Sequence, residues 1–213
     1  MRRRTAILIS GRGSNMVALI EAARATDFPA EIVLVLSNRP DAGGLRHAHE
    51  AGIATEAIDH RPFRGDRAAH EAAIHAALTA AGAEIVCLAG YLRLLTPGFV
   101  NQWRGRMLNV HPSLLPAFPG LHTHARALAT GVKLHGCTVH LVTEQMDEGP
   151  ILAQAAVPVL SGDTEDVLAD RVLTQEHIIY PAALGDFASE MARREPPAAA
   201  ALLNPLPRRA SLP

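Results

Sequence analysis

The chain has 213 residues, 48% of them hydrophobic, which is enough to bury the core of one α/β domain or two small ones. Lys and Arg number 20 against 21 Asp and Glu, without a long run of either sign, which argues against a general nucleic-acid or membrane-surface binder. The basic N-terminus leads into too short an apolar run for a signal peptide, and no stretch is long enough to span a membrane, so we expect a cytoplasmic protein. Cys87 and Cys137 lie inside apolar segments without a CxxC pair, as expected for reduced, buried thiols.

In the first half of the chain, continuous apolar runs alternate with segments of helical period. Continuous runs predict strands that are buried on both faces, as in a parallel sheet covered by helices. We therefore predict strands at residues 5–10, 31–37, 55–58, 84–89 and 106–110, and helices at residues 15–25, 44–51 and 66–81.

The pattern changes in the second half. Residues 136–143 and 151–159 alternate partly and are joined by the acidic turn "EQMDEGP", which predicts antiparallel strands. Asp163 and Thr164 can cap a last helix that runs from about Glu165 towards Glu190. Without an internal repeat or a boundary, residues 1–190 are expected to form a single domain, and the Pro/Ala-rich residues 191–213 a loosely ordered tail.

A glycine-containing loop, "ISGRGSNM", connects the first strand to the first helix. It contains Gly11, Gly13, Ser14 and Asn15, where glycines let a ligand approach the backbone and a helix N-terminus offers N–H groups to an anion. Met16 stands where a dinucleotide fingerprint has its third glycine, and the GK[ST] of a nucleotide-triphosphate loop is missing. The loop thus favours a single phosphate on a small substrate over NAD or ATP; a simple turn capped by Ser14 is the alternative.

Polar side chains end the fifth predicted strand. Asn109 and His111, two residues apart, can project from the same side, at the carboxyl edge where parallel sheets bind ligands. An amide can donate to a developing oxyanion, a histidine can move a proton, and Asp147 in the later turn can fold back to orient it. This suggests proton management around a tetrahedral intermediate, unless the histidine and the acidic turn are purely structural.

Five histidines raise the alternative of a metal site: His111, His122, His124, His135 and His140. His122 and His124 form a possible ligand pair, but a second pair at metal-like spacing on a helix is missing. We therefore expect that no metal is required.

Six segments in this order resemble one family: "ISGRGSN", "VLSNRPDAGGL", "LAGYLRLLTP", "LNVHPSLLPAFPGLHTHARAL", "HGCTVHLVTEQMDEGPI" and "TQEHIIYP". From about residue 5 to 188 the chain is similar to the folate-dependent phosphoribosylglycinamide formyltransferases. The resemblance implies the formyltransferase fold, a mostly parallel, Rossmann-like twisted α/β sheet flanked by helices with a late antiparallel strand. It also implies transfer of the formyl group of 10-formyltetrahydrofolate to the glycine amine of glycinamide ribonucleotide in purine biosynthesis.

The resemblance assigns catalytic roles to three residues. Asn109 and His111 would stabilise the oxyanion, His111 would help protonate the departing folate nitrogen, and Asp147 would hold His111 and relay protons. The ribonucleotide would be bound by Gly11, Gly13, Ser14, Asn15 and Glu176, with Glu176 on the ribose hydroxyls.

Folate binding is assigned in the same way. The folate pocket would involve Arg67, Leu92, Arg93, Leu94, Leu95, Thr143 and Asp147, with Arg64 as the competitor of Arg67 for the glutamate carboxylate. His122 and His124 would belong to a mobile loop over the site, within residues 116–134, or be ordinary polar loop residues. Leu173 departs from the family, many members of which carry a polar residue near the ribonucleotide.

Three other functions compete. A formyl-folate hydrolase would use the same Asn, His and Asp on water, and more often has an additional regulatory domain. A methionyl-tRNA formyltransferase would need a C-terminal nucleic-acid-binding domain, and a catalytically silent phosphate-binding protein would not need all three polar residues. The expected partners are small-molecule substrates, not nucleic acid or membrane, and the chain is expected to be a monomer or homodimer.

Overall fold

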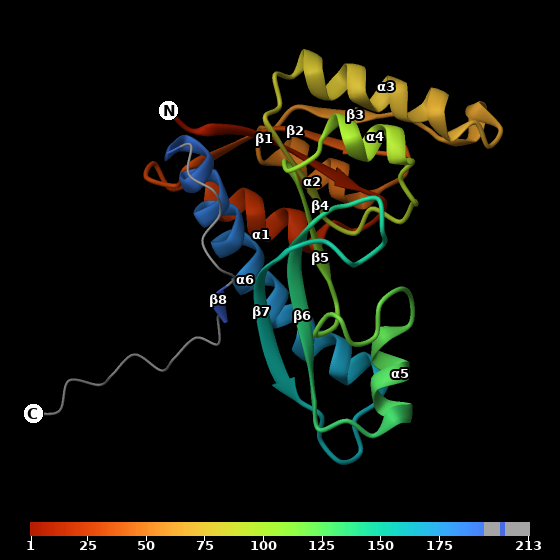
Figure 1. Ribbon diagram of the computed structural model, residues 1–213. Coiled ribbons are helices and arrows are strands. Elements are labelled where there is room, and N and C mark those ends of the chain that lie inside the picture. Colours follow the sequence, from red (N-terminus) through yellow and green to blue (C-terminus); the bar gives the residue numbers. More distant parts are fainter. Residues whose placement is uncertain (194–200, 203–213) are drawn as a thin grey trace, which may run out of the picture.

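A twisted central sheet organises the protein in a computed structural model that describes residues 1–193 and 201–202 (Figure 1). Its strands follow the order β3-β2-β1-β4-β5-β6-β7-β8. The first five strands in the chain run parallel, β6 is antiparallel to both β5 and β7, and β8 pairs parallel with β7, so the predicted late antiparallel strand is confirmed. The strands are β1 (Arg3–Ile9), β2 (Ala30–Ser37), β3 (Thr55–Ala57), β4 (Ile85–Leu88), β5 (Met107–His111), β6 (Leu134–Leu141), β7 (Ile151–Pro158) and β8 (Ala201–Leu202).

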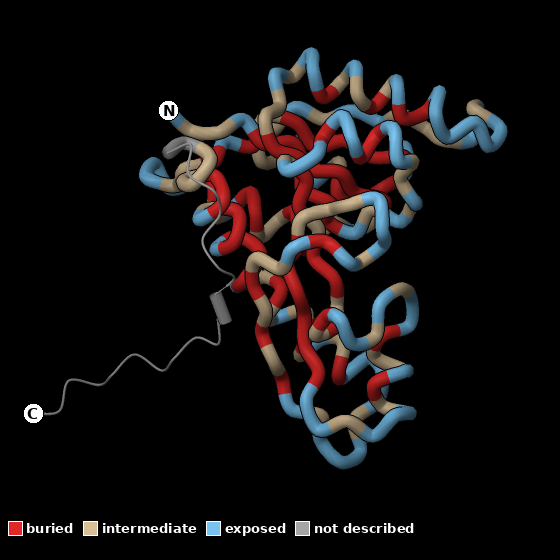
Figure 2. The backbone as a smooth tube through the Cα atoms, viewed as in Figure 1, coloured by how far each residue is buried: buried red, intermediate tan, exposed pale blue. Residues whose placement is uncertain are grey.

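Helices cover both faces of the sheet, with α1 and α6 on one side and α3 and α4 on the other (Figure 1). Along β1, Ile7 and Ile9 belong to the core under α1 and α6, whereas Ala6 and Leu8 belong to the core under α3 and α4. Because alternate side chains enter two cores, the strand reads as a continuous apolar run, and Figure 2 shows the central strands buried. The helices are α1 (Ser14–Ala23), α2 (Gly43–Glu50), α3 (Arg67–Ala80), α4 (Pro97–Gln102), α5 (Thr123–Thr130) and α6 (Glu165–Arg193), with a 3-10 turn, η1 (Arg61–Phe63).

Every predicted strand and helix is present, shifted by a few residues at its ends. Two short helices were not predicted, although α4 has a clear start signal, since the Thr96 hydroxyl accepts from the Phe99 amide and Pro97 occupies the first turn. The last helix runs to Arg193, and its cap is Thr164, whose Oγ1 accepts from the Val167 amide at 3.3 Å.

The segment expected as a mobile loop within residues 116–134 contains helix α5, which packs against α6. Residues 123–130 are therefore helical, and movement of this segment over the site stays a prediction. Of the predicted tail, residues 194–200 and 203–213 lie outside the described residues, and the boundary of the single domain stays a prediction.

Two contacts tie the long helix α6 to the sheet. The buried hydroxyl of Tyr180 lies 3.1 Å from the carbonyl oxygen of Leu88 and 3.2 Å from that of Leu108, at β4 and β5. At the opposite edge, the Arg3 guanidinium donates to the carbonyl oxygen of Met191 at 2.8 Å, which joins the start of β1 to the end of α6. Among the helices of residues 1–193, none is both long and apolar enough to cross a membrane.

Candidate active site

A cleft of about 580 Å³ lies at the carboxyl ends of β4 and β5. Its walls come from the segment after β4, from β5 and from the turn between β6 and β7. Large apolar side chains stay exposed along it, with Leu92 at 78%, Leu94 at 63% and Met146 at 56% exposure. Exposed apolar surface lining a cleft is typical of a site for a flat apolar ligand. Of the residues predicted to bind folate, the cleft is lined by Leu92, Arg93, Leu94, Leu95, Thr143 and Asp147.

The arginine predicted to bind the folate carboxylate lies elsewhere. Arg67 is the exposed first residue of α3 and does not line the cleft, and neither does its competitor Arg64. Its role therefore stays a prediction that the geometry of the cleft does not support.

His111 and Asp147 meet inside the cleft, as predicted from the carboxyl-edge rule. The imidazole is 7% exposed, and its Nε2 donates to the carbonyl oxygen of Phe118 at 3.0 Å. Its Nδ1 faces Asp147 Oδ2 at 3.5 Å. The ring is therefore oriented in the cleft by a backbone carbonyl on one side and a carboxylate on the other.

Asn109 is held by a histidine that sequence reasoning did not place in the site. Its Nδ2 lies 3.2 Å from Nε2 of His140, with which it is paired in the β5–β6 register. Because His140 Nδ1 donates to the carbonyl oxygen of Leu141 at 3.0 Å, Nε2 is left as the acceptor. Burial lowers the pKa of His140 and outweighs the Leu141 carbonyl and Asp147, which act in the opposite direction. The ring is therefore kept in this neutral form. One N–H of the amide is thus fixed and the other is left for a ligand.

The turn that carries Asp147 is held in a constrained conformation. Asp147 has a φ of 60°, and its Oδ2 accepts from the Gly120 amide at 2.8 Å. A β-carbon on Gly149 would lie 1.7 Å from the carbonyl oxygen of Leu141, so only glycine allows the turn to return against β6. The carboxylate therefore reaches His111 through backbone geometry as well as through its own contacts.

The residues predicted for the ribonucleotide lie together at a second place on the same edge. Gly13 has a φ of 74° and precedes α1, and the exposed Ser14 begins that helix. Asn15 Nδ2 donates to Glu176 Oε2 at 2.6 Å, across 161 positions of sequence. Burial raises the pKa of the Glu176 carboxyl, while Asn15 lowers it. Leu173 lies half-buried on α6, one turn before Glu176.

The remaining histidines near the cleft form a pair on α5 and β6. His124 Nδ1 lies 3.2 Å from His135 Nε2, and His122 occupies the left-handed position before α5. Within residues 1–193, no group of three or more His, Cys, Asp or Glu side chains is placed to hold a metal ion. Cys87 and Cys137 are buried and free, as expected.

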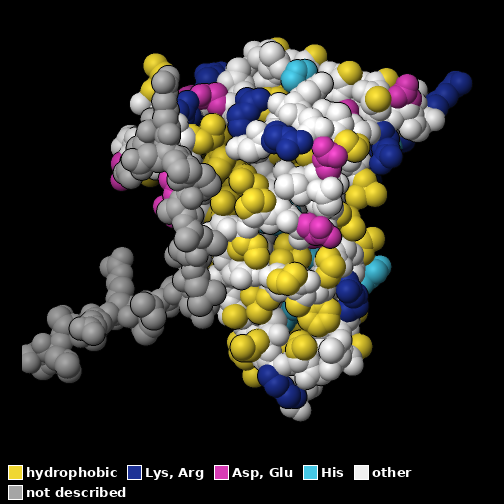
Figure 3. Space-filling model, viewed as in Figure 1, with side chains coloured by type: hydrophobic (Ala, Val, Ile, Leu, Met, Phe, Trp, Pro, Cys, Tyr) yellow, Lys and Arg dark blue, Asp and Glu magenta, His cyan; other side chains and the backbone are white. Residues whose placement is uncertain are grey.

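The surface around these sites has mixed charge. On the face drawn in Figure 3, positive and negative side chains are interspersed, and hydrophobic side chains gather over β6 and β7. On this face, the basic side chains are therefore not gathered into one patch.

Comparison with known proteins gives one consistent result. The family model described as formyl transferase matches residues 3–184. The phosphoribosylglycinamide formyltransferase of Escherichia coli (strain K12) is 46% identical over 182 residues, covering 85% of each chain. The trifunctional purine biosynthetic protein adenosine-3 of Homo sapiens is 48% identical over 188 residues, which are 88% of this chain and 18% of that protein. The chain spans between 14% and 19% of the trifunctional relatives that it matches.

Solved structures agree with the sequence relatives. The phosphoribosylglycinamide formyltransferase from Brucella melitensis is 61% identical, with a TM-score of 0.85, over 89% of this chain and 97% of that chain. A formyltetrahydrofolate deformylase from Burkholderia mallei is 29% identical, with a TM-score of 0.80, over 89% of this chain and 66% of that chain.

Proposed function

This chain belongs to the formyl transferase family, and from that premise we propose that it is a phosphoribosylglycinamide formyltransferase. It transfers the formyl group of 10-formyltetrahydrofolate to the glycine amine of glycinamide ribonucleotide, a reaction of purine biosynthesis. The observation that carries the proposal is the meeting of Asn109, His111 and Asp147 in a cleft with apolar walls.

The geometry supports direct transfer without a covalent enzyme intermediate. The amine attacks the formyl carbon, and the carbonyl oxygen becomes an oxyanion that the free N–H of Asn109 and the His111 imidazolium stabilise. When the tetrahedral intermediate collapses, the bond between carbon and the folate nitrogen breaks, and His111 supplies a proton to that nitrogen from Nδ1, whose 3.5 Å separation from Asp147 is longer than an ordinary hydrogen bond. Asp147 holds the imidazolium during the reaction and, through water, accepts the proton that the attacking amine loses.

The two substrates occupy adjacent parts of the same edge. The folate's ring system lies in the apolar cleft, against residues 92–95 and 143–147. The ribonucleotide phosphate binds at Gly11, Gly13, Ser14 and Asn15, and Glu176 accepts from the ribose hydroxyls. The enzyme works in the cytoplasm as a monomer or homodimer, needs no metal, and has small molecules as partners.

A steady-state assay tests this function. The purified protein is incubated with 10-formyltetrahydrofolate, with and without glycinamide ribonucleotide, and tetrahydrofolate and formylated ribonucleotide are measured. Release of tetrahydrofolate that depends on the ribonucleotide and matches formylated product is the expected result. Release without the ribonucleotide would instead identify a deformylase, the activity named for one structural relative.

The catalytic assignment predicts the effect of two substitutions. His111→Ala and Asp147→Asn should each lower kcat by about a hundredfold or more, the usual range for general acid–base and oxyanion groups. His49→Ala, which removes an exposed histidine on α2, is the matched control and should retain the parent kcat. Parent-level turnover in either site variant would show that these roles are wrong.

A further inference from the structure

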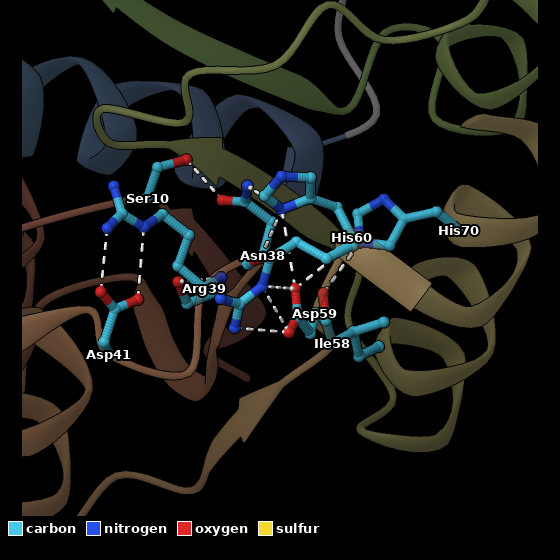
Figure 4. A network of polar contacts seen from close by, with 10 residues as sticks. Ser10, Asn38, Arg39, Asp41, Ile58, Asp59, His60 and His70 are labelled. Atoms are coloured by element: carbon cyan, nitrogen blue, oxygen red, sulfur yellow. Dashed lines mark hydrogen bonds and ion pairs between the residues drawn. The ribbon is translucent and has the colours of Figure 1, made fainter. Parts of the chain in front are cut away.

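A belt of polar contacts crosses the carboxyl ends of four neighbouring strands, β3, β2, β1 and β4. Its centre is a pair of side chains, Ser10 after β1 and Asn38 after β2, which point toward one another in Figure 4. Each residue is only 3% exposed, so their polar atoms must find partners inside the protein. The function proposed above gives no role to either residue.

The hydroxyl of Ser10 both donates and accepts. It donates to Asn38 Oδ1 at 2.5 Å and accepts from the backbone amide of Leu92 at 2.8 Å. The backbone amide of Ser10 also donates to the carbonyl oxygen of Gly90 at 3.0 Å. Two bonds from one residue therefore hold the segment that follows β4.

Asn38 is itself fixed from the other side. His60 Nδ1 donates to the carbonyl oxygen of Asn38 at 3.0 Å, and Asn38 Nδ2 lies 3.3 Å from the same ring atom. Further along the belt, His70 Nε2 on α3 donates to the carbonyl oxygen of Ile58 at 2.9 Å. His60 therefore holds the backbone of Asn38, whose side chain accepts from Ser10.

Ser10 lies between the two substrate sites. The next residue in the chain, Gly11, opens the loop assigned to the ribonucleotide phosphate. Leu92, whose amide Ser10 holds, begins the cleft segment, and its side chain is 78% exposed. Tyr91 and Leu95 pack against the core on either side of it, so the bond from Ser10 is the polar contact that holds the backbone of Leu92 between these two anchors.

We propose that Ser10 and Asn38 are positioning residues. They hold the cleft segment that contains Leu92, where the folate binds, next to the loop of Gly11 and Gly13, where the ribonucleotide phosphate binds. This inference rests on the proposed function for the identity of the ligands. It assigns to Ser10 an effect on folate affinity, not on the chemical step, because Asn109, His111 and Asp147 are held by other contacts.

The test compares Ser10→Ala and Ser10→Thr with the parent protein and with Ser37→Ala. Ser37 is a matched control, since it is a fully buried serine at the same sheet edge whose hydroxyl accepts from the Arg39 amide at 3.0 Å and not from Leu92. Ser10→Ala should weaken tetrahydrofolate binding about tenfold, as expected for a lost buried hydrogen bond, and raise the KM for 10-formyltetrahydrofolate similarly with kcat within about threefold. Ser10→Thr keeps the oxygen and should lie closer to the parent than Ser10→Ala.

Amide hydrogen exchange gives a readout that needs no ligand. In the ligand-free protein, Ser10→Ala should speed exchange at Leu92, whereas Ser37→Ala should not. If Ser10→Ala does not fold, Asn38→Ala replaces it. This variant retains the Ser10 hydroxyl that accepts from the Leu92 amide, so it should change affinity and exchange in the same direction but less. Two results would overturn the proposal. One is that Ser10→Ala has the same tetrahydrofolate affinity and the same Leu92 exchange rate as Ser37→Ala. The other is that Ser10→Thr is as impaired as Ser10→Ala.

Failure of this inference and failure of the proposed function give different results. A parent protein that binds tetrahydrofolate but formylates no ribonucleotide would contradict the transferase, while the binding and exchange comparisons would still decide the role of Ser10. A parent that binds no tetrahydrofolate would overturn both.

Discussion

His140 accepts a hydrogen bond from the Asn109 amide because its other ring nitrogen is already engaged with the carbonyl oxygen of Leu141. Removing the acceptor would let the amide rotate, and the N–H meant for the oxyanion would lose its direction. His140→Leu should therefore lower kcat by about tenfold or more. Removing the oxyanion donor itself would cost more, but here the donor stays and only its direction is lost. His140→Gln, which can offer Oε1 near the position of Nε2, should retain more of the parent kcat. The comparison of kcat for the two variants is the measurement, and equal losses would contradict the positioning role.

The buried carboxylate of Glu176 lowers the stability of the fold while it serves, in the proposed function, to bind the ribonucleotide. Burial raises its pKa above the ordinary value, partly offset by the hydrogen bond from Asn15, so the folded protein binds its proton more tightly than the unfolded chain does. Ionisation of this carboxyl therefore costs folding free energy at pH 7, and stability from this group increases as the pH falls towards the unfolded value of 4.5.

Glu176→Gln should accordingly raise the free energy of unfolding at pH 7, with the gain shrinking as the pH is lowered and the parent carboxyl takes up its proton. It should also raise the KM for glycinamide ribonucleotide by about tenfold or more, as expected for hydrogen bonds to a charged group. Chemical denaturation at several pH values and steady-state kinetics measure the two effects. Asp170→Asn, an exposed change on the same helix, is the control for both. A stability gain that is independent of pH would contradict this account.

At the scale of elements, the turn between β6 and β7 determines where Asp147 lies. Gly149→Ala would place a β-carbon against the carbonyl oxygen of Leu141, a backbone atom that cannot move aside without moving β6. We expect a loss of about 1–3 kcal/mol of stability, typical of overpacking, together with a fall in kcat because Asp147 is two residues away. Thermal unfolding and kcat are to be compared with those of Gly98→Ala on α4, where the nearest heavy atom is 3.8 Å away. Equal behaviour of the two variants would show that the close approach is not needed.

The elements also show what the sequence could reveal. Strands such as β1 and β2 were predictable because side chains on both of their faces enter the core, which leaves an unbroken apolar run. Helix α5 was not, since it spans only eight residues between a left-handed histidine and a glycine, inside a segment rich in turn residues. The edge rule predicted the position of Asn109 and His111 and left Asp147 as a residue that could fold back to them, but the role of His140 depends on the β5–β6 register, which no local pattern encodes.

The whole molecule should respond to acid through its buried histidines. Burial, followed by the nearby charges of His124 and His111, lowers the pKa of His135 to about 4. Because the unfolded chain takes up this proton near pH 6.5, the free energy of unfolding should fall as the pH drops from about 6.5 to about 4. Chemical denaturation at intervals across this range should show a smaller loss for His135→Gln than for the parent. The exposed substitution His49→Gln should leave the dependence unchanged, and an unchanged slope in His135→Gln would contradict the prediction.

The contact between Arg3 and Met191 lies far from the chemistry of the protein. It brings the first strand and the last helix together at the amino edge of the parallel strands, whereas every group assigned to the reaction lies at the carboxyl edge. A substitution at this junction can therefore reach the reacting groups only through the length of the strands between them.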